Sequence, residues 1–188
     1  MSKPVTRRRR RRPKKKKWPY VILVIVILIG IGLVASVLLG YNPLLERQLR
    51  TQFGSEFFSD FGDLSPAENG ADLDSIVANY TPAFESLQDQ AMKRLDDLLA
   101  TALEEYYAQE QSGTVDRFKL TNKYIQAGRI LEDNVDATFY GLLDEMKAEL
   151  EGNNLPLDVT TEISNTYEEA KADKKRELLD LLRQQVGE

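Results

Sequence analysis

The sequence begins with a strongly basic segment that leads directly into a long uncharged one. Residues 1–17 contain eleven Lys or Arg and no acidic residue, and the apolar run 21–39 follows almost at once. A helix of these 19 residues would be about 30 Å long, the usual thickness of the hydrocarbon core of a bilayer. Excess Lys and Arg hold the adjoining end of such a helix in the cytoplasm. The sequence therefore predicts a single-pass protein of the cell membrane, with its N-terminus cytoplasmic and its C-terminal domain extracytoplasmic.

A cleavable signal peptide is the alternative interpretation of this segment. Its apolar core would usually span about 7 to 15 residues and would end at a site of small residues. Here the run is longer, and the small residues Ala35 and Ser36 are followed by Val-Leu-Leu. An uncleaved signal-anchor helix is therefore expected. The chain has no Cys, which rules out both a disulfide framework and a lipid attached to cysteine.

Four segments follow from this pattern. We expect a polybasic cytoplasmic tail over residues 1–17 and a transmembrane signal-anchor helix over 18–41. A juxtamembrane segment and linker over 42–72 and an extracytoplasmic helical bundle over 73–188 complete the chain.

The charge divides sharply between the two sides of the predicted membrane. The tail holds 11 of the 25 basic residues, which leaves 14 basic against all 30 acidic residues in the remainder, a net charge of −16. A polycationic tail is expected to bind anionic membrane lipid at up to about 1 kcal/mol per charge. The residues expected to do so are Arg7, Arg8, Arg9, Arg10, Arg11, Arg12, Lys14, Lys15, Lys16 and Lys17.

Two other interpretations of the tail stay open. Polycationic arms also bind nucleic acid without sequence preference, and a cytoplasmic protein could recognise the tail. Nucleic acid is the less favoured partner, because membrane topology and lipid binding already account for the basic tail.

Within the membrane run, three small residues recur at four-residue spacing: Gly32, Ser36 and Gly40. Such spacing places small side chains on one face of a helix and lets a second helix approach closely. It indicates helix pairing, and hence a homo-oligomer as one form of partnership. The competing explanation is that glycine is common in membrane helices.

Beyond the membrane, the apolar residues follow helical periodicity. We expect a short helical face from Leu73 to Tyr80, followed by helices over 82–111, 115–151 and 157–186, with Thr81-Pro82 starting the first of the three. The expected core stripes are Phe84, Leu87, Ala91, Leu95, Leu98, Ala102 and Tyr106; then Phe118, Ile125, Leu131, Val135, Phe139, Leu142, Met146 and Leu150; and finally Ile163, Tyr167, Ala170, Leu178, Leu181, Leu182 and Val186.

Helices of similar length with short connections pack as antiparallel neighbours. The predicted fold is therefore all-α: a single transmembrane helix followed by an elongated antiparallel three-helix bundle with coiled-coil-like packing. A parallel dimeric coiled coil is the weaker alternative, because strict heptads are not maintained.

The juxtamembrane segment contains two further signals. Asn42-Pro43 is typical of a helix start. Phe53, Phe57, Phe58 and Phe61 follow near-helical spacing that Gly54 and Gly62 interrupt. These rings are expected to pack on the base of the domain, with contact to lipid as the alternative.

No catalytic, cofactor-binding or metal-binding residue is predicted. The chain has no His and no Cys, and it contains no Ser-x-x-Lys, so the usual activated nucleophiles are missing. The acidic groups at Asp96-Asp97, Glu104-Glu105, Glu132-Asp133-Asp136, Asp144-Glu145-Glu149 and Glu168-Glu169 fall mostly between the stripes and are expected to be solvated helix faces.

We expect a protein that is not an enzyme and needs no cofactor: an interaction or regulatory module that presents its bundle to a protein partner in the cell envelope. A sensory or signalling subunit of a membrane complex is the first alternative. A membrane tether that binds nucleic acid through the basic tail is the second.

Overall fold

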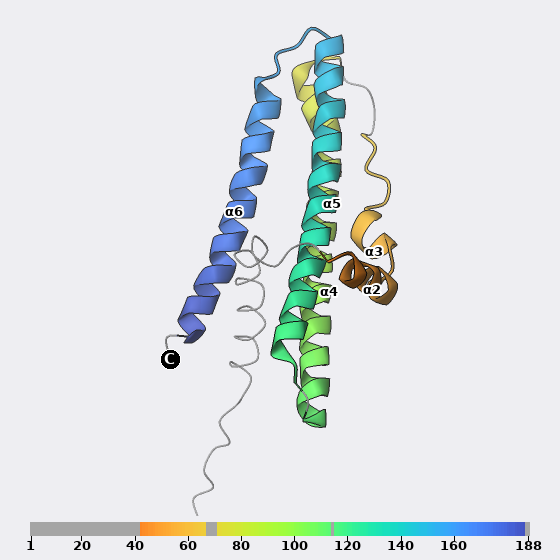
Figure 1. The fold of residues 1–188 in the computed structure, drawn as a ribbon. Helices are drawn as coiled ribbons and strands as arrows, with labels where there is room; N and C mark the ends of the chain where they lie inside the picture. Colours follow the sequence, from red (N-terminus) through yellow and green to blue (C-terminus); the bar gives the residue numbers. More distant parts are fainter. Residues whose placement is uncertain (1–41, 67–70, 114, 187–188) are drawn as a thin grey trace, which may run out of the picture.

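Every regular element in the described part of the chain is an α-helix (Figure 1). The computed structural model describes residues 42–66, 71–113 and 115–186, without the side chains of Lys175 and of residues 177–186. The helices are α2 (Pro43–Phe53), α3 (Glu56–Ser59), α4 (Leu73–Ser112), α5 (Arg117–Gly152) and α6 (Asp158–Val186). The predicted all-α class is confirmed for these residues.

The predicted membrane helix falls outside the residues that the structure describes. Within the described ranges, no helix combines the length and the apolar character that crossing a bilayer requires. The predicted basic tail and anchor helix lie in residues 1–41, outside those ranges. Both therefore stay predictions.

Helix α2 begins where the sequence indicates. The side chain of Asn42 accepts hydrogen bonds from the backbone N–H groups of Leu44 and Leu45, and Pro43 occupies the first turn, where its missing N–H costs nothing. Leu49 is fully buried, so α2 packs against the domain along one face.

The aromatic cluster packs onto the domain, as expected. Phe58 is fully buried and Phe61 nearly so, while Phe53 and Phe57 are partly buried against the same core. The ring of Phe53 meets that of Tyr124 in α5 edge-on, with 6.4 Å between ring centroids. These rings therefore fasten α2 and α3 to the side of α5.

Helix α4 corrects the prediction that a new helix starts at Thr81-Pro82. The helix begins instead at Leu73, where Asp72 and Ser75 form a reciprocal capping box, and it continues through Pro82. Ile76 and Tyr80 before the proline and Ala83 after it are all buried, so one core face spans the site. Pro82 is exposed, and so is Ala78, whose carbonyl loses its helical partner and can bond to water.

The turn between α4 and α5 is built around Gly113. This residue adopts φ 73° and donates its N–H to the carbonyls of Gln109 and Glu110. Glycine suits this left-handed position because it has no Cβ. Asp116 then caps α5 by accepting a hydrogen bond from the N–H of Lys119 at 3.0 Å.

Helices α4 and α5 form the main seam, and they run in opposite directions (Figure 1). Of the stripe predicted for α4, four residues are buried, and Phe84, Ala91 and Leu95 are partly buried against the core. In α5 the stripe is confirmed from Leu131 to Leu150. The buried residues of the two helices are Ile76, Tyr80, Ala83, Leu87, Leu98, Ala102, Tyr106, Leu120, Tyr124, Ala127, Ile130, Leu131, Val135, Phe139, Leu142, Leu143, Met146 and Leu150.

The start of the α5 stripe was predicted wrongly. Phe118 is 65 % exposed, whereas Leu120, Tyr124 and Ala127 are buried. At about 100° per residue, Phe118 lies roughly 200° around the helix from Leu120, so the two cannot face the same neighbour.

Helix α6 lies along a different side of α5 from α2 and α3 (Figure 1). Ile163 and Tyr167 are partly buried, and the ring of Tyr167 stacks on that of Phe139 with centroids 3.8 Å apart. Ala170, predicted to be part of this stripe, is exposed. The ribbon of α6 is farther from α5 at its Val186 end than at its Asp158 end (Figure 1). The side chains predicted at 178–186 lie outside the description.

Candidate functional site

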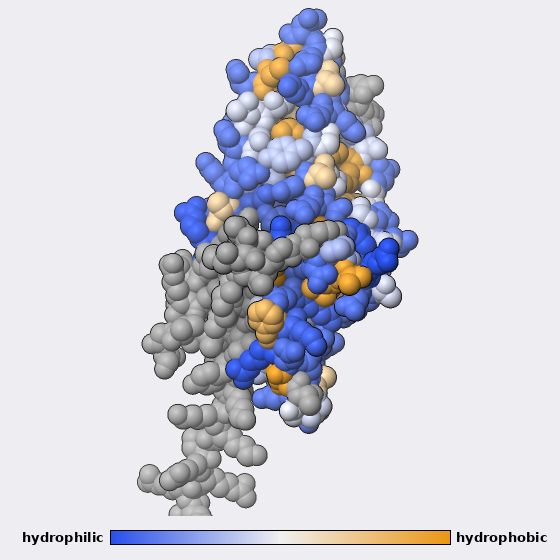
Figure 2. Space-filling model, in the orientation of Figure 1, coloured by the Kyte–Doolittle hydropathy of each residue, from blue (hydrophilic) through white to orange (hydrophobic). Residues whose placement is uncertain are grey.

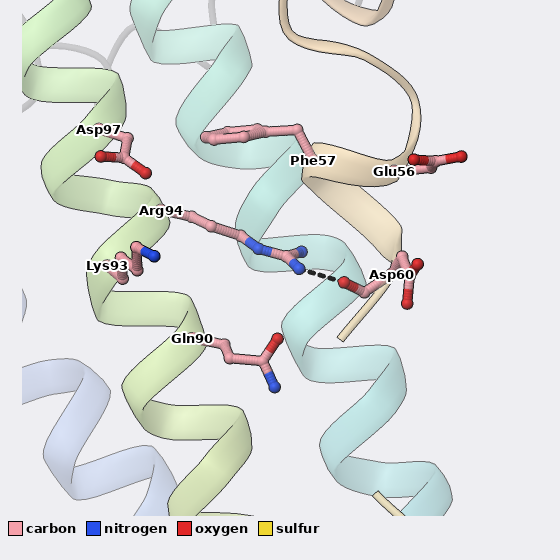
Figure 3. A pocket seen from close by; sticks show the side chains of 7 residues that line it. All are labelled: Glu56, Phe57, Asp60, Gln90, Lys93, Arg94 and Asp97. Carbon is pink, nitrogen blue, oxygen red and sulfur yellow. Dashed lines mark hydrogen bonds between the residues drawn. The ribbon is translucent and has the colours of Figure 1, made fainter. Parts of the chain in front are cut away.

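A groove of about 330 Å³ lies between α3 and α4 and is the first candidate site. It brings together side chains of both signs from segments that are far apart in the sequence, as the close view shows (Figure 3). Its lining residues are Glu56, Phe57, Asp60, Gln90, Lys93, Arg94 and Asp97.

Arg94 extends across the groove from α4 to the end of α3 (Figure 3). Its Nη2 donates a hydrogen bond to the backbone carbonyl of Asp60, and its guanidinium carbon lies 4.2 Å from the centroid of the Phe61 ring. Its Nη1 is buried and has no hydrogen-bond partner among the described residues. Burial lowers the pKa of Arg94, and the charge of Asp60 opposes that shift. The guanidinium stays charged, because its ordinary pKa is far above neutral pH.

Gln90 adds a second link between α4 and the same segment. Its Nε2 donates to the carbonyl of Phe61 at 2.7 Å and to the hydroxyl of Ser86 at 3.2 Å. Gln90 and Arg94 thus satisfy two consecutive backbone carbonyls that follow α3. Their first role is structural, since they hold α3 and its aromatic rings against α4.

The chemistry of the groove is recognition of polar groups. The carboxylates of Glu56 and Asp60 point away from Arg94 (Figure 3), so the guanidinium bonds to the backbone carbonyl of Asp60 and not to either carboxylate. Lys93 and Asp97 add one charge of each sign. The lining residues offer charged and amide groups that can hydrogen-bond to a partner's polar side chain.

A second cluster joins α5 to α6 around Lys171. Its Nζ lies 2.7 Å from Asp136 Oδ2, 3.5 Å from Glu132 Oε1 and 3.7 Å from Glu168 Oε1. The hydroxyl of Tyr167 donates to Asp136, and that of Tyr140 donates to Glu168 Oε1 at 2.7 Å. One cation is therefore surrounded by three carboxylates.

The protonation of this cluster follows from its contacts. Burial alone would lower the pKa of Lys171, but the hydrogen bond and charge of Asp136, with Glu132 and Glu168, raise it overall. Burial, and then the hydrogen bond to Asp136, raises the pKa of the Tyr167 hydroxyl. The lysine is thus held as a cation and the tyrosine as a neutral donor.

A third polar contact is inserted into the α4–α5 seam. Glu105 Oε2 accepts from Lys123 Nζ at 2.5 Å and from the Tyr124 hydroxyl at 2.9 Å. Burial, followed by the hydrogen bond to Glu105, raises the pKa of Tyr124. This arrangement satisfies the hydroxyl of a buried tyrosine.

Metal binding finds no support in the described part of the chain. No group of three or more carboxylates there has the spacing to hold a metal ion. Glu132, Asp136 and Glu168 are instead arranged around Lys171, which already supplies their positive charge.

The predicted site residues all lie outside the part of the chain that the structure describes. Arg7 to Arg12, Lys14 to Lys17, and Gly32, Ser36 and Gly40 lie in residues 1–41, outside the described ranges. The expectation that the acidic groups are all solvated is wrong for Glu105, Glu132 and Asp136, which are partly buried and paired.

Sequence reasoning missed both Arg94 and the Lys171 cluster. A weak signal existed for the cluster, because Glu132 and Asp136 are spaced as i and i+4 beside the core residues Leu131 and Val135. Comparison with known protein families, with curated proteins and with solved structures found no match.

Proposed function

We propose that this chain is a single-pass membrane protein whose extracytoplasmic helices act as an interaction or regulatory module without catalytic activity. Residues 18–41 form the signal anchor, residues 1–17 bind lipid on the cytoplasmic side, and α4, α5 and α6 form an elongated antiparallel bundle with coiled-coil-like packing. The partner is a protein of the cell envelope, and a second copy of the chain is the alternative.

The arrangement of α6 is the observation that carries this proposal. In its first half, α6 contacts α5 through Ile163, Tyr167 and Lys171, and the side chains at 177–186 lie outside the description. Beyond them the helix continues for about four turns to Val186, and its ribbon diverges from α5 (Figure 1). A helix held at one end and diverging at the other offers a face to a partner helix.

The sequence of this second half fits such a role. Leu178, Leu181, Leu182 and Val186 recur at the three- and four-residue spacing of a single helical face. The helical partner would cover this face while the first half of α6 stays on α5. The excess of 30 acidic over 14 basic residues outside the tail favours a partner with a basic surface.

Site-specific photo-crosslinking of the full chain in its native membranes tests the proposal. A photoreactive side chain at position 182 should form an adduct with another protein. The same group at Glu162, an exposed position in the first half of α6, should form much less. Adducts of equal strength from both positions, or none from either, would contradict the proposal. An adduct only with a second copy would identify self-association instead.

The proposed topology has its own measurement. The chain contains no Cys, so a single cysteine introduced at Ser2 or at Glu188 can be labelled without further changes. In intact cells a membrane-impermeant maleimide should label position 188 and should leave position 2 unlabelled until the membrane is opened. Labelling of position 2 in sealed cells would contradict the orientation.

A further inference from the structure

We propose that the flank formed by α2 and the first third of α5 docks on the surface of the anionic bilayer that the anchor helix leaves. The name α2–α5 flank is used here for five exposed residues at the starts of two helices: Leu44 and Arg47 of α2, and Arg117, Phe118 and Lys119 of the first turn of α5. The inference rests on the membrane anchoring proposed above and adds to it a second, folded contact with lipid. Three features coincide on this flank: the start of the described chain, two exposed apolar side chains, and a group of cations.

The start of the described chain is fixed to α5. Nε2 of Gln126 donates a hydrogen bond to the backbone carbonyl of Asn42 at 2.7 Å. Asn42 follows immediately on the anchor segment 18–41, so α5 passes close to the point where the chain leaves the bilayer. Phe118 precedes Gln126 by eight residues, which is about 12 Å along a helix. The first turn of α5 is thus about two helical turns from the point where the chain leaves the bilayer.

The flank also carries the two most exposed large apolar side chains of the described residues. Leu44 is 70 % and Phe118 65 % exposed, against 37 % for Tyr140 and 36 % for Met92. In the space-filling view, hydrophobic residues lie at the height of α2 directly beside strongly hydrophilic ones (Figure 2). Leu and Phe next to cations are typical of protein surfaces that bury their apolar side chains in the boundary between headgroups and acyl chains.

Charge separates this flank from the rest of the domain. Residues 117–131 contain four Lys or Arg and no acidic residue, although acidic residues outnumber basic ones by 30 to 14 beyond the tail. Arg47, Arg117 and Lys119 are exposed. Among the described residues neither arginine forms a salt bridge, and Lys119 reaches only the cap residue Asp116, at 3.9 Å.

The sign of the surrounding surface gives the docked orientation. An anionic lipid surface attracts these cations within a Debye length, about 8 to 10 Å at physiological salt. The same surface repels the acidic remainder of the bundle. The flank is therefore the face that turns towards the bilayer, and the far ends of α5 and α6 are held away from the lipid.

The chain's single tryptophan, Trp18, makes a direct test practical. In bilayers whose acyl chains carry bromine, tryptophan fluorescence is quenched only near the lipid. Trp18 of the unaltered chain reports whether the anchor is inserted. The variant Trp18→Phe with Phe118→Trp reports on the flank, and Trp18→Phe with Tyr140→Trp is the matched control, about 33 Å further along the same helix.

In anionic bilayers we expect the brominated lipid to quench the fluorescence of the tryptophan at position 118 strongly. The tryptophan at position 140 should be quenched only weakly. Adding Arg117→Gln and Lys119→Gln should weaken docking by about fivefold for each charge, equivalent to about 1 kcal/mol. Lys147→Gln, at an exposed site near the other end of α5, should leave the quenching unchanged. In bilayers of zwitterionic lipid the loss at position 118 should be small.

Several results would overturn the inference. Equal quenching at positions 118 and 140 excludes docking through this flank. Quenching at position 118 that changes neither with lipid charge nor with the two Gln substitutions excludes an electrostatic basis for the docking. A blue-shifted indole at 118 without bromine quenching shows that a second copy or another protein covers the flank. If Trp18 itself escapes quenching, the anchoring is wrong and the docking is wrong with it, whereas quenching of Trp18 alone removes only the docking.

Discussion

The Nζ of Lys171 lies 2.7 Å from Oδ2 of Asp136, and this contact joins α6 to α5 across 35 residues of sequence. Glu132 and Glu168 share the same cation, and the Tyr167 hydroxyl shares Asp136. In the part of α6 whose side chains are described, this mixed polar and aromatic contact therefore adds to the apolar packing of Val159 and Ile163.

Removing the charge of Lys171 should loosen that attachment. Lys171→Met keeps the aliphatic stem but leaves three carboxylates without their cation. The cluster is partly exposed, so we expect a loss of about 1 to 2 kcal/mol in the free energy of unfolding. Urea unfolding of the full chain in detergent, followed by circular dichroism, measures it, and hydrogen exchange should show faster exchange in α6. Lys147→Met, at an exposed position of α5, is the control, and an equal loss there would argue against the specific role of Lys171.

Buried tyrosines should make the fold sensitive to high pH. Burial, and then the charge and hydrogen bond of Glu149, raises the pKa of Tyr80 from 10.0 to about 12. The unfolded chain releases this proton near pH 10 while the folded chain retains it. The stabilisation is thus complete below about pH 10 and is lost as the pH rises towards 12, by roughly 1 to 2 kcal/mol. Urea unfolding at about pH 8 and about pH 11 measures the fall in the free energy of unfolding between the two pH values. Tyr80→Phe should reduce this fall. An unchanged fall would show that Tyr80 is not its source.

Pro82 should be a weak point of α4. Pro82→Ala restores an N–H donor for the Ala78 carbonyl and removes the ring from the helix interior. We expect a gain of about 1 to 3 kcal/mol, reduced by up to about 1 kcal/mol because the unfolded chain regains freedom. Thermal unfolding should show a higher midpoint. Glu85→Ala, at an exposed position of the same helix, should change stability by less than about 0.5 kcal/mol. A lower midpoint for Pro82→Ala would mean that the proline has a packing role.

Replacing each of two glycines by alanine should change the free energy of unfolding in opposite directions. Gly113 adopts φ 73° at the end of α4, so Gly113→Ala should cost about 1 kcal/mol through backbone strain. Gly128 lies inside α5, and a Cβ added there meets no atom within 4 Å. Gly128→Ala should therefore stabilise the protein by about 0.5 to 1 kcal/mol. Equilibrium unfolding of both variants tests the pair, and two changes of the same sign would contradict the assigned conformations.

The helices could be predicted from the sequence because their signals are local. Asn42-Pro43 marks the start of α2, and Gly113 and the 152–154 segment mark the ends of α4 and α5. Each signal depends on residues within one turn of the site. Pro82 led to a wrong prediction because proline usually interrupts a helix. Here the burial of one continuous helix face on both sides of Pro82 outweighs that local effect.

The partners of the side chains could not be predicted in the same way. Near its start α5 offers two apolar stripes, one through Phe118 and Ile125 and one through Leu120 and Tyr124, and only the position of α4 decides between them. Arg94 and Asp60 are 34 residues apart, so their contact depends on how α3 folds back on α4. Periodicity gives the faces of helices, whereas their register along one another is a tertiary property.

The hydrogen bond between Asn42 and Gln126 gives the bundle the mechanics of a lever. The attachment lies on the flank of α5, nine residues from its first residue and 26 from its last. About 39 Å of helix therefore project beyond the pivot. If the anchor helix proposed for residues 18–41 tilts relative to α5, the far end of α5 moves most. A change of about 10° at the pivot would displace that end by about 7 Å.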